Sequence, residues 1–191
     1  MTKSIDFYFD FISPYSYLAH KKIKEKININ FIYKPVLVGG LHNLQGITAP
    51  AFIKSKLKHM ISDCDLIAKK EKTAFIWNSK FPINSLNIMR GYLFISDDVK
   101  NLYLNEIFDA YWKDNLDTSN EEVLKPILKK CEINPIDFFD GIKDPEIKDE
   151  LKALTQEAHD KEIFGAPTFV VNNKIFWGQD RLEFALNEYN K

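Results

Sequence analysis

The chain has only two cysteines, Cys64 and Cys131, and they lie far apart in the sequence. They form no C-x-x-C pair, which excludes a local redox disulfide and a zinc knuckle at these residues. We also expect no metal site, because metal-ligand spacing is absent among the four histidines, His20, His42, His59 and His159.

Long hydrophobic runs and an excess of one charge are also missing. No apolar stretch approaches the roughly 20 residues that span a bilayer. The first residues, Met-Thr-Lys-Ser-Ile-Asp-Phe, lack the apolar region of a signal peptide, so we expect a cytoplasmic protein. The net charge is −1, with 26 basic and 27 acidic side chains. This balance gives no electrostatic basis for binding nucleic acid or a membrane.

The length of the chain suffices for one domain, or for one domain that carries a large insertion. Apolar residues make up 45% and aromatic residues 14% of the 191 residues, so a sizeable core is expected. The first part of the chain predicts a strand, a helix and a second strand, over residues 4–10, 14–26 and 29–38. Pro35 indicates the end of a strand or an edge strand. Gly39-Gly40 breaks the pattern, and residues 41–51 are predicted to form a loop.

The middle and the end of the chain follow different patterns. From about residue 52 to 158, apolar residues recur at helical spacing, with helices predicted over 84–95, 97–112, 119–131, 134–140 and 144–160. Residues 168–172 and 174–177 predict a hairpin with an Asn172-Asn173 turn. Asp180 is the predicted N-cap of a last helix, with Glu183 three residues on. The helical block therefore interrupts a smaller α/β unit, with one domain of residues 1–45 and 159–191 and a helical insertion of residues 46–158.

Ser13 and Pro14 lie where the first predicted strand passes into the first helix. Pro14 suits the first helical position and Ser13 suits the N-cap, and a capping role alone would account for both. The start of a helix is also an anion site, because free N–H groups and the helix dipole converge there. A thiolate supplied from elsewhere could therefore be held beside Ser13.

Five segments, in order along nearly the full length of the chain, carry a resemblance to known proteins: FDFISPYSYLA (9–19), PVLVGG (35–40), FPIN (81–84), FGAPTFVV (164–171) and FWGQDR (176–181). With these segments the whole chain resembles the 2-hydroxychromene-2-carboxylate isomerases, and the order of its elements resembles the thioredoxin fold. That family stands with the kappa-class glutathione transferases and the disulfide oxidoreductase DsbA. The resemblance implies an α/β, thioredoxin-like fold with a large all-helical insertion (DsbA-like). It also implies a cis Ala166–Pro167 bond opposite the start of the first helix.

The resemblance implies a glutathione site around Ser13, which stands where redox relatives carry the first cysteine of C-x-x-C. Its hydroxyl cannot form a disulfide but can donate a hydrogen bond to a thiolate, so Ser13 is the predicted catalytic residue. Ala166, beside Pro167, is expected to pair with the cysteinyl backbone of glutathione. The γ-glutamyl end is expected to lie against Trp177, Gly178, Gln179 and Asp180. Tyr15, Phe81 and Asn84 are predicted walls of the substrate site, although aromatic residues are more often core residues.

The implied activity is a glutathione-dependent isomerisation, in which a thiolate adds reversibly to a small conjugated aromatic carboxylate and allows ring opening and cis–trans change. Two alternatives stay open: a kappa-like glutathione transferase and a non-catalytic protein that binds thiols or peptides. The resemblance also implies a homodimer, which is the usual assembly in the family. Ile47 departs from the family, because kappa-type sequences carry there an Asn that touches glutathione. The Lys that some isomerases carry near Gly40 is also missing, which leaves the substrate open.

Overall fold

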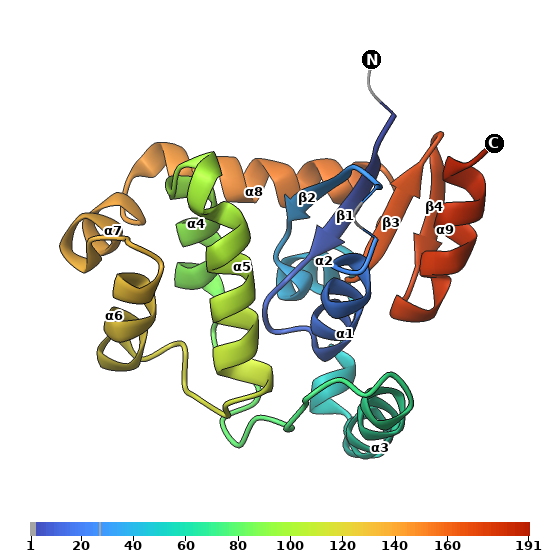
Figure 1. The fold of residues 1–191 in the computed structure, drawn as a ribbon, viewed down its shortest axis with the longest axis horizontal. Helices are drawn as coiled ribbons and strands as arrows, with labels where there is room; N and C mark the ends of the chain where they lie inside the picture. Colours follow the sequence, from blue (N-terminus) through green and yellow to red (C-terminus); the bar gives the residue numbers. More distant parts are fainter. Residues whose placement is uncertain (1–2, 27) are drawn as a thin grey trace.

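The centre of the computed structural model, which describes residues 3–26 and 28–191, is a four-stranded sheet (Figure 1). The strands are β1 (Ile5–Phe9), β2 (Phe31–Pro35), β3 (Thr168–Val171) and β4 (Lys174–Trp177), in the order β2-β1-β3-β4. β1 pairs with β2 in parallel and with β3 antiparallel, and β3 and β4 form the predicted hairpin. Pro35 is the last residue of an edge strand, as predicted, where a missing N–H is tolerated.

Helices surround this sheet, and the predicted α/β class is confirmed. Those before and within the middle block are α1 (Pro14–Ile23), α2 (Val38–Leu44), the 3₁₀ turn η1 (Pro50–Phe52), α3 (Lys54–Lys70), α4 (Leu86–Phe94), α5 (Asp97–Trp112), α6 (Glu121–Lys130), α7 (Pro135–Gly141) and α8 (Pro145–Asp160). A 3₁₀ turn, η2 (Gln179–Arg181), and α9 (Leu182–Tyr189) end the chain. No helix in the described ranges has both the length and the apolar character needed to cross a membrane.

Successive side chains of β1 point to opposite faces of the sheet, and the buried residues therefore form a core on each face. Ile5, Phe7 and Phe9 point to one face and belong to a large cluster with residues of α1, α5 and α9. Tyr8 points to the other face, where it packs with residues of α2 and α8. In Figure 1, α8 runs from the group of α4–α7 across the back of the sheet. The site described below lies at the end of these strands.

The ring of Phe108 joins the helical block to the sheet. This α5 residue is fully buried, and its centroid lies 4.7 Å from that of Phe11, 6.0 Å from that of Phe9 and 6.0 Å from that of Tyr17. One cluster of buried residues therefore runs through the sheet and the block. The division into residues 1–45 with 159–191 and residues 46–158 stays a prediction. Its second boundary falls inside α8, which contacts α4, α2 and β2.

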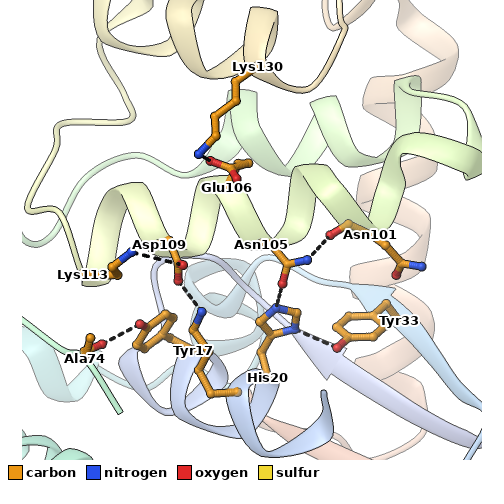
Figure 2. Close-up of polar contacts among 11 residues, drawn as sticks. Tyr17, His20, Tyr33, Ala74, Asn101, Asn105, Glu106, Asp109, Lys113 and Lys130 are labelled. Atoms are coloured by element: carbon orange, nitrogen blue, oxygen red, sulfur yellow. Dashed lines mark hydrogen bonds and ion pairs between the residues drawn. The ribbon is translucent and has the colours of Figure 1, made fainter. Parts of the chain in front are cut away.

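A buried polar network fixes α1 against α5 (Figure 2). His20 lies between Asn105, whose Oδ1 accepts from Nε2 at 2.9 Å, and Tyr33, whose hydroxyl donates to Nδ1 at 2.7 Å. Burial lowers the pKa of His20 to about 4, so the ring is neutral. At the next turn, Lys21 pairs with Asp109 of α5. The orientation of α1, which carries Ser13 at its start, thus depends on the helical block.

The prediction for the segment after β2 is wrong. Gly39-Gly40 does not break the structure, because both glycines lie in α2, and the strand predicted over 29–38 ends at Pro35. The start of α2 is stabilised by remote side chains: the Val38 amide donates to Asp10 Oδ2 at 2.9 Å, and the Leu37 amide donates to Thr155 Oγ1 at 3.1 Å. The residues predicted as a loop, 41–51, are partly α2 and η1.

Asp180 is not the N-cap of the last helix, which corrects a second prediction. It lies in η2, and α9 begins two residues later after Arg181, with no side-chain cap. The Asp180 carboxylate instead accepts a hydrogen bond from Arg181 Nη1 at 2.7 Å. The cause is local, because Gly178 leaves β4 with a φ of 111° and a 3₁₀ turn precedes the helix.

Two other local predictions are confirmed. Asn172 and Asn173 have φ values of 50° and 60°, which are the left-handed values of a tight hairpin turn. The Ala166–Pro167 bond is cis.

We expect Phe108→Ala to lower the free energy of unfolding by about 3–5 kcal/mol, because it leaves a cavity where the helical block meets the sheet. Urea denaturation measures this change. Phe52→Ala is the matched control, because Phe52 is 72% exposed, and it should change stability by less than about 0.5 kcal/mol. Equal effects of the two variants would contradict this account of the core.

Candidate functional site

A cleft of about 730 Å³ opens at the start of α1. It is bounded by the Ser13 loop, α2, the segment around η1, one face of α3, residues 81–86 and the loop that precedes β3. Most of its lining is apolar. Among the predicted site residues, those that line it are Ser13, Tyr15, Phe81, Asn84, Ala166 and Trp177.

Ser13 caps α1, as predicted. Its φ and ψ are −82° and 115°, and its Oγ accepts a hydrogen bond from the Ser16 amide at 3.1 Å. The same hydroxyl donates to the carbonyl oxygen of Ala166 at 2.9 Å, across 153 residues of sequence. The Tyr15 amide stands at the second helical position, where a helix offers no internal acceptor. The Ser13 hydroxyl and the free amide groups at the start of α1 therefore lie on the same side, opposite the loop before β3.

Ala166 presents backbone groups to this cleft. Its carbonyl accepts from Ser13, and its amide has no acceptor within the part of the chain that the structure describes. Pro167, which is buried, accepts at its carbonyl oxygen a hydrogen bond from the Gly178 amide at 2.9 Å. This bond ties the loop to the end of β4. An extended peptide laid along Ala166 would find a free donor there.

Trp177 forms a wall of the cleft with Phe164. Their ring centroids are 4.8 Å apart, and both side chains are partly exposed to solvent. Gly165 lies beneath the indole, where an added Cβ would come within 2.9 Å of Nε1. The absence of a side chain at Gly165 thus permits this close approach.

Gln179 and Asp180 lie in a second hollow, of about 300 Å³, rather than in the cleft with Ser13. Gln179 is buried, and its Oε1 accepts from Lys22 Nζ at 2.8 Å. Lysines and acidic residues alternate around this hollow: Lys22, Lys26 and Lys70 with Glu25, Glu71, Asp180 and Glu183. The structure therefore divides the predicted glutathione residues between an apolar cleft and a polar hollow.

The three predicted substrate walls are held in place by contacts outside the cleft. Tyr15 donates its hydroxyl to Asp63 Oδ2 at 2.8 Å, and burial raises its pKa. Phe81 packs on Trp77, with ring centroids 4.9 Å apart. Asn84 accepts at Oδ1 from the Leu86 amide at 3.0 Å, at the start of α4. These side chains shape the site rather than react in it.

A family model described as a DSBA-like thioredoxin domain matches residues 4–190. The chain belongs to this family. It is 27% identical to a 2-hydroxychromene-2-carboxylate isomerase of Sphingobium xenophagum, over 96% of each chain. It is 26% identical to glutathione S-transferase kappa 1 of Caenorhabditis elegans, over 93% of this chain and 86% of the relative.

A solved structure of a 2-hydroxychromene-2-carboxylate isomerase superposes on this fold with a TM-score of 0.88. It is 22% identical and covers 96% of this chain and 92% of its own. The DsbA-like fold and the family resemblance expected from the sequence are thereby confirmed.

In this DsbA-like chain neither cysteine reaches the cleft. Cys64 and Cys131 are both free and buried. Burial raises the pKa of Cys64 to about 12 and that of Cys131 to about 11. Both thiols are therefore protonated at neutral pH, and a thiolate at Ser13 has to come from a ligand.

Asp10 is a site residue that the sequence analysis missed. It is 1% exposed and lines the cleft. Its Oδ1 accepts a hydrogen bond from the Ile12 amide at 3.1 Å, and its Oδ2 accepts one from the Val38 amide at 2.9 Å. Asp10 thereby joins the Ser13 loop to the start of α2, and burial raises its pKa to about 6. The signal available in the sequence was a carboxylate directly after an aromatic-rich strand, among apolar residues.

His42, which the sequence analysis considered only as one of four histidines without metal-ligand spacing, lines the cleft from α2. Burial lowers its pKa, so the ring is neutral at neutral pH. Its Nδ1 is buried and has no hydrogen-bond partner among the described residues. His42 therefore adds a neutral ring to the lining of the cleft.

We expect the stability of the protein relative to Asp10→Asn to fall as the pH rises from about 4 to about 6.5. The pKa of Asp10 is raised from 3.8 to about 6, so the folded state binds the proton more tightly than the unfolded state. The relative loss should be about 3 kcal/mol, at about 1.4 kcal/mol for each pH unit between the two pKa values.

Urea denaturation of both proteins at several pH values checks this. His20 acts in the opposite direction, because its pKa is lowered, but it is present in both proteins and cancels in the difference. A difference in stability that is independent of pH would show that Asp10 does not titrate in this way.

Proposed function

We propose that this protein is a glutathione-dependent isomerase of the 2-hydroxychromene-2-carboxylate isomerase type. The observation that carries the proposal is the position of the Ser13 hydroxyl, at the start of α1 and 2.9 Å from the Ala166 carbonyl oxygen. The chain has no thiol of its own at this place. The likeness to relatives named as isomerases and as kappa-class glutathione transferases supports the proposal.

The residues present fit glutathione. The free Ala166 amide suits the cysteinyl carbonyl of an extended tripeptide, which brings the sulfur towards Ser13. The γ-glutamyl end carries a carboxylate and an ammonium, and the mixed charges near Gln179 and Asp180 suit such a pair. Ile47 lines the cleft but can give only an apolar contact, unlike the Asn of kappa-type sequences.

Bound glutathione would supply a thiolate for reversible addition to a conjugated carbon, which turns a double bond into a rotatable single bond. Ser13 would turn its hydroxyl from the Ala166 carbonyl oxygen to donate to the sulfur. The free N–H groups and the dipole of α1 would lower the thiol pKa further, against the effect of the apolar walls. Those walls would exclude water from the reacting groups, and Asp10 keeps two of them, the Ser13 loop and α2, in place.

We expect Ser13→Ala to lower the affinity for glutathione thiolate and the turnover by roughly 10- to 100-fold, the effect of one hydrogen bond to a charged group. Calorimetric titration and steady-state kinetics measure the two effects. Ser16→Ala is the matched control in the same helical turn, because Ser16 Oγ is buried without a hydrogen-bond partner in the described structure. Equal behaviour of the two variants would refute the role of Ser13.

An assay of glutathione consumption separates the isomerase from a kappa-like transferase. With 2-hydroxychromene-2-carboxylate or an uncharged cis-configured conjugated ketone, the isomerase should change the ultraviolet spectrum of at least one substrate and regenerate glutathione. Stoichiometric loss of free glutathione would indicate the transferase. Binding of glutathione without either reaction would indicate a non-catalytic binding protein.

A further inference from the structure

We infer that the substrate held by the cleft is an uncharged, apolar conjugated carbonyl compound rather than a carboxylate. This inference rests on the proposed function and narrows its substrate class. Although the chain has 26 basic side chains, no Lys or Arg is among the described residues that line the cleft. A carboxylate placed there would have no cation to pair with.

The ionisable groups that do line the cleft give a carboxylate no support. Asp10 is itself an acid and would repel a second negative charge. The hydroxyl of Tyr15 already donates to Asp63. His42 is neutral, because burial lowers its pKa.

The anion site at the start of α1 is not available to the substrate either. In the proposed function this site holds the thiolate, and a carboxylate brought beside the thiolate would meet a like charge. An anion that enters an apolar cleft also loses its hydration without an ion pair in return. Both effects favour a neutral substrate.

The apolar lining provides what such a molecule needs. Phe52, Phe81 and Trp177 bring aromatic rings from three different segments, and Ile47 and Met60 add aliphatic surface. The volume of about 730 Å³ lies in the range of small-molecule sites. His42 adds a neutral ring, and no charge, to this lining.

The chemistry balances for a neutral enone. A C–S bond forms at the carbon β to the carbonyl while the C=C electron pair moves towards the carbonyl oxygen. After rotation about the new single bond, the pair returns and the C–S bond breaks. No oxidant or reductant is required.

Binding of two matched probes tests the inference without catalysis. Coumarin and coumarin-3-carboxylate share a ring system and differ by the charged group. Calorimetry is done with saturating S-methylglutathione, whose capped sulfur cannot react. We expect coumarin to bind at least roughly tenfold more tightly, a difference of about 1.4 kcal/mol. Equal binding, or tighter binding of the carboxylate, would overturn the inference.

A matched pair of variants tests whether the lining of the cleft causes the preference for the uncharged probe. Ile47→Lys introduces a cation at a lining residue that is 48% exposed, and Ile136→Lys adds the same charge on α7, where Ile136 is 72% exposed. We expect Ile47→Lys to improve binding of coumarin-3-carboxylate by at least roughly fivefold, about 1 kcal/mol, and Ile136→Lys to leave it unchanged. Equal effects of the two variants would show that the cleft does not set the preference.

Titration of glutathione alone separates this inference from the proposed function. If glutathione binds and the carboxylate probe is still preferred, the inference fails and the isomerase proposal stands. If glutathione does not bind, the isomerase proposal fails, and the probe pair measured without S-methylglutathione still decides the character of the cleft.

Discussion

The hydrogen bond from Ser13 Oγ to the Ala166 carbonyl oxygen is the contact on which the candidate site depends. It is possible because β1 and β3 are antiparallel neighbours in the sheet, with Phe7 opposite Phe169, so the segment that leaves β1 meets the segment that enters β3 at one end of the strands. The core on either side holds this geometry: α1 is fixed to α5 by His20, and α2 is fixed to the Ser13 loop by Asp10. A hydroxyl thus stands at the start of a helix, with a peptide backbone opposite it.

Local chemistry made part of this structure predictable from the sequence. Ser13-Pro14 supplies a cap and a first helical residue, and Asn172-Asn173 supplies two residues that tolerate a positive φ. The helix predicted over 97–112 matches α5, because its apolar residues recur at regular helical spacing and most of them are buried in the structure. The fold and the list of site residues came from the family resemblance, because no single motif is specific enough to give them.

The errors arise where remote residues determine local structure. α2 contains two glycines and lacks a capping residue of its own, so its formation depends on Asp10 and Thr155, which the sequence does not place beside it. Asp180 is of a residue type that often caps helices, but here it lies inside a 3₁₀ turn and its carboxylate accepts a hydrogen bond from Arg181. His42 gave no signal, because only the folding of α2 onto the cleft brings it to the site.

The central claim is that the Ser13 hydroxyl stands where redox relatives carry a cysteine, and that it favours the ionised thiol of bound glutathione. The pKa of the thiol of bound glutathione tests this most directly, measured by the ultraviolet absorbance of the thiolate as the complex is titrated with base. The account predicts a pKa well below that of free glutathione, returning towards the free value in Ser13→Ala. A bound thiol that titrates as it does in solution would contradict it.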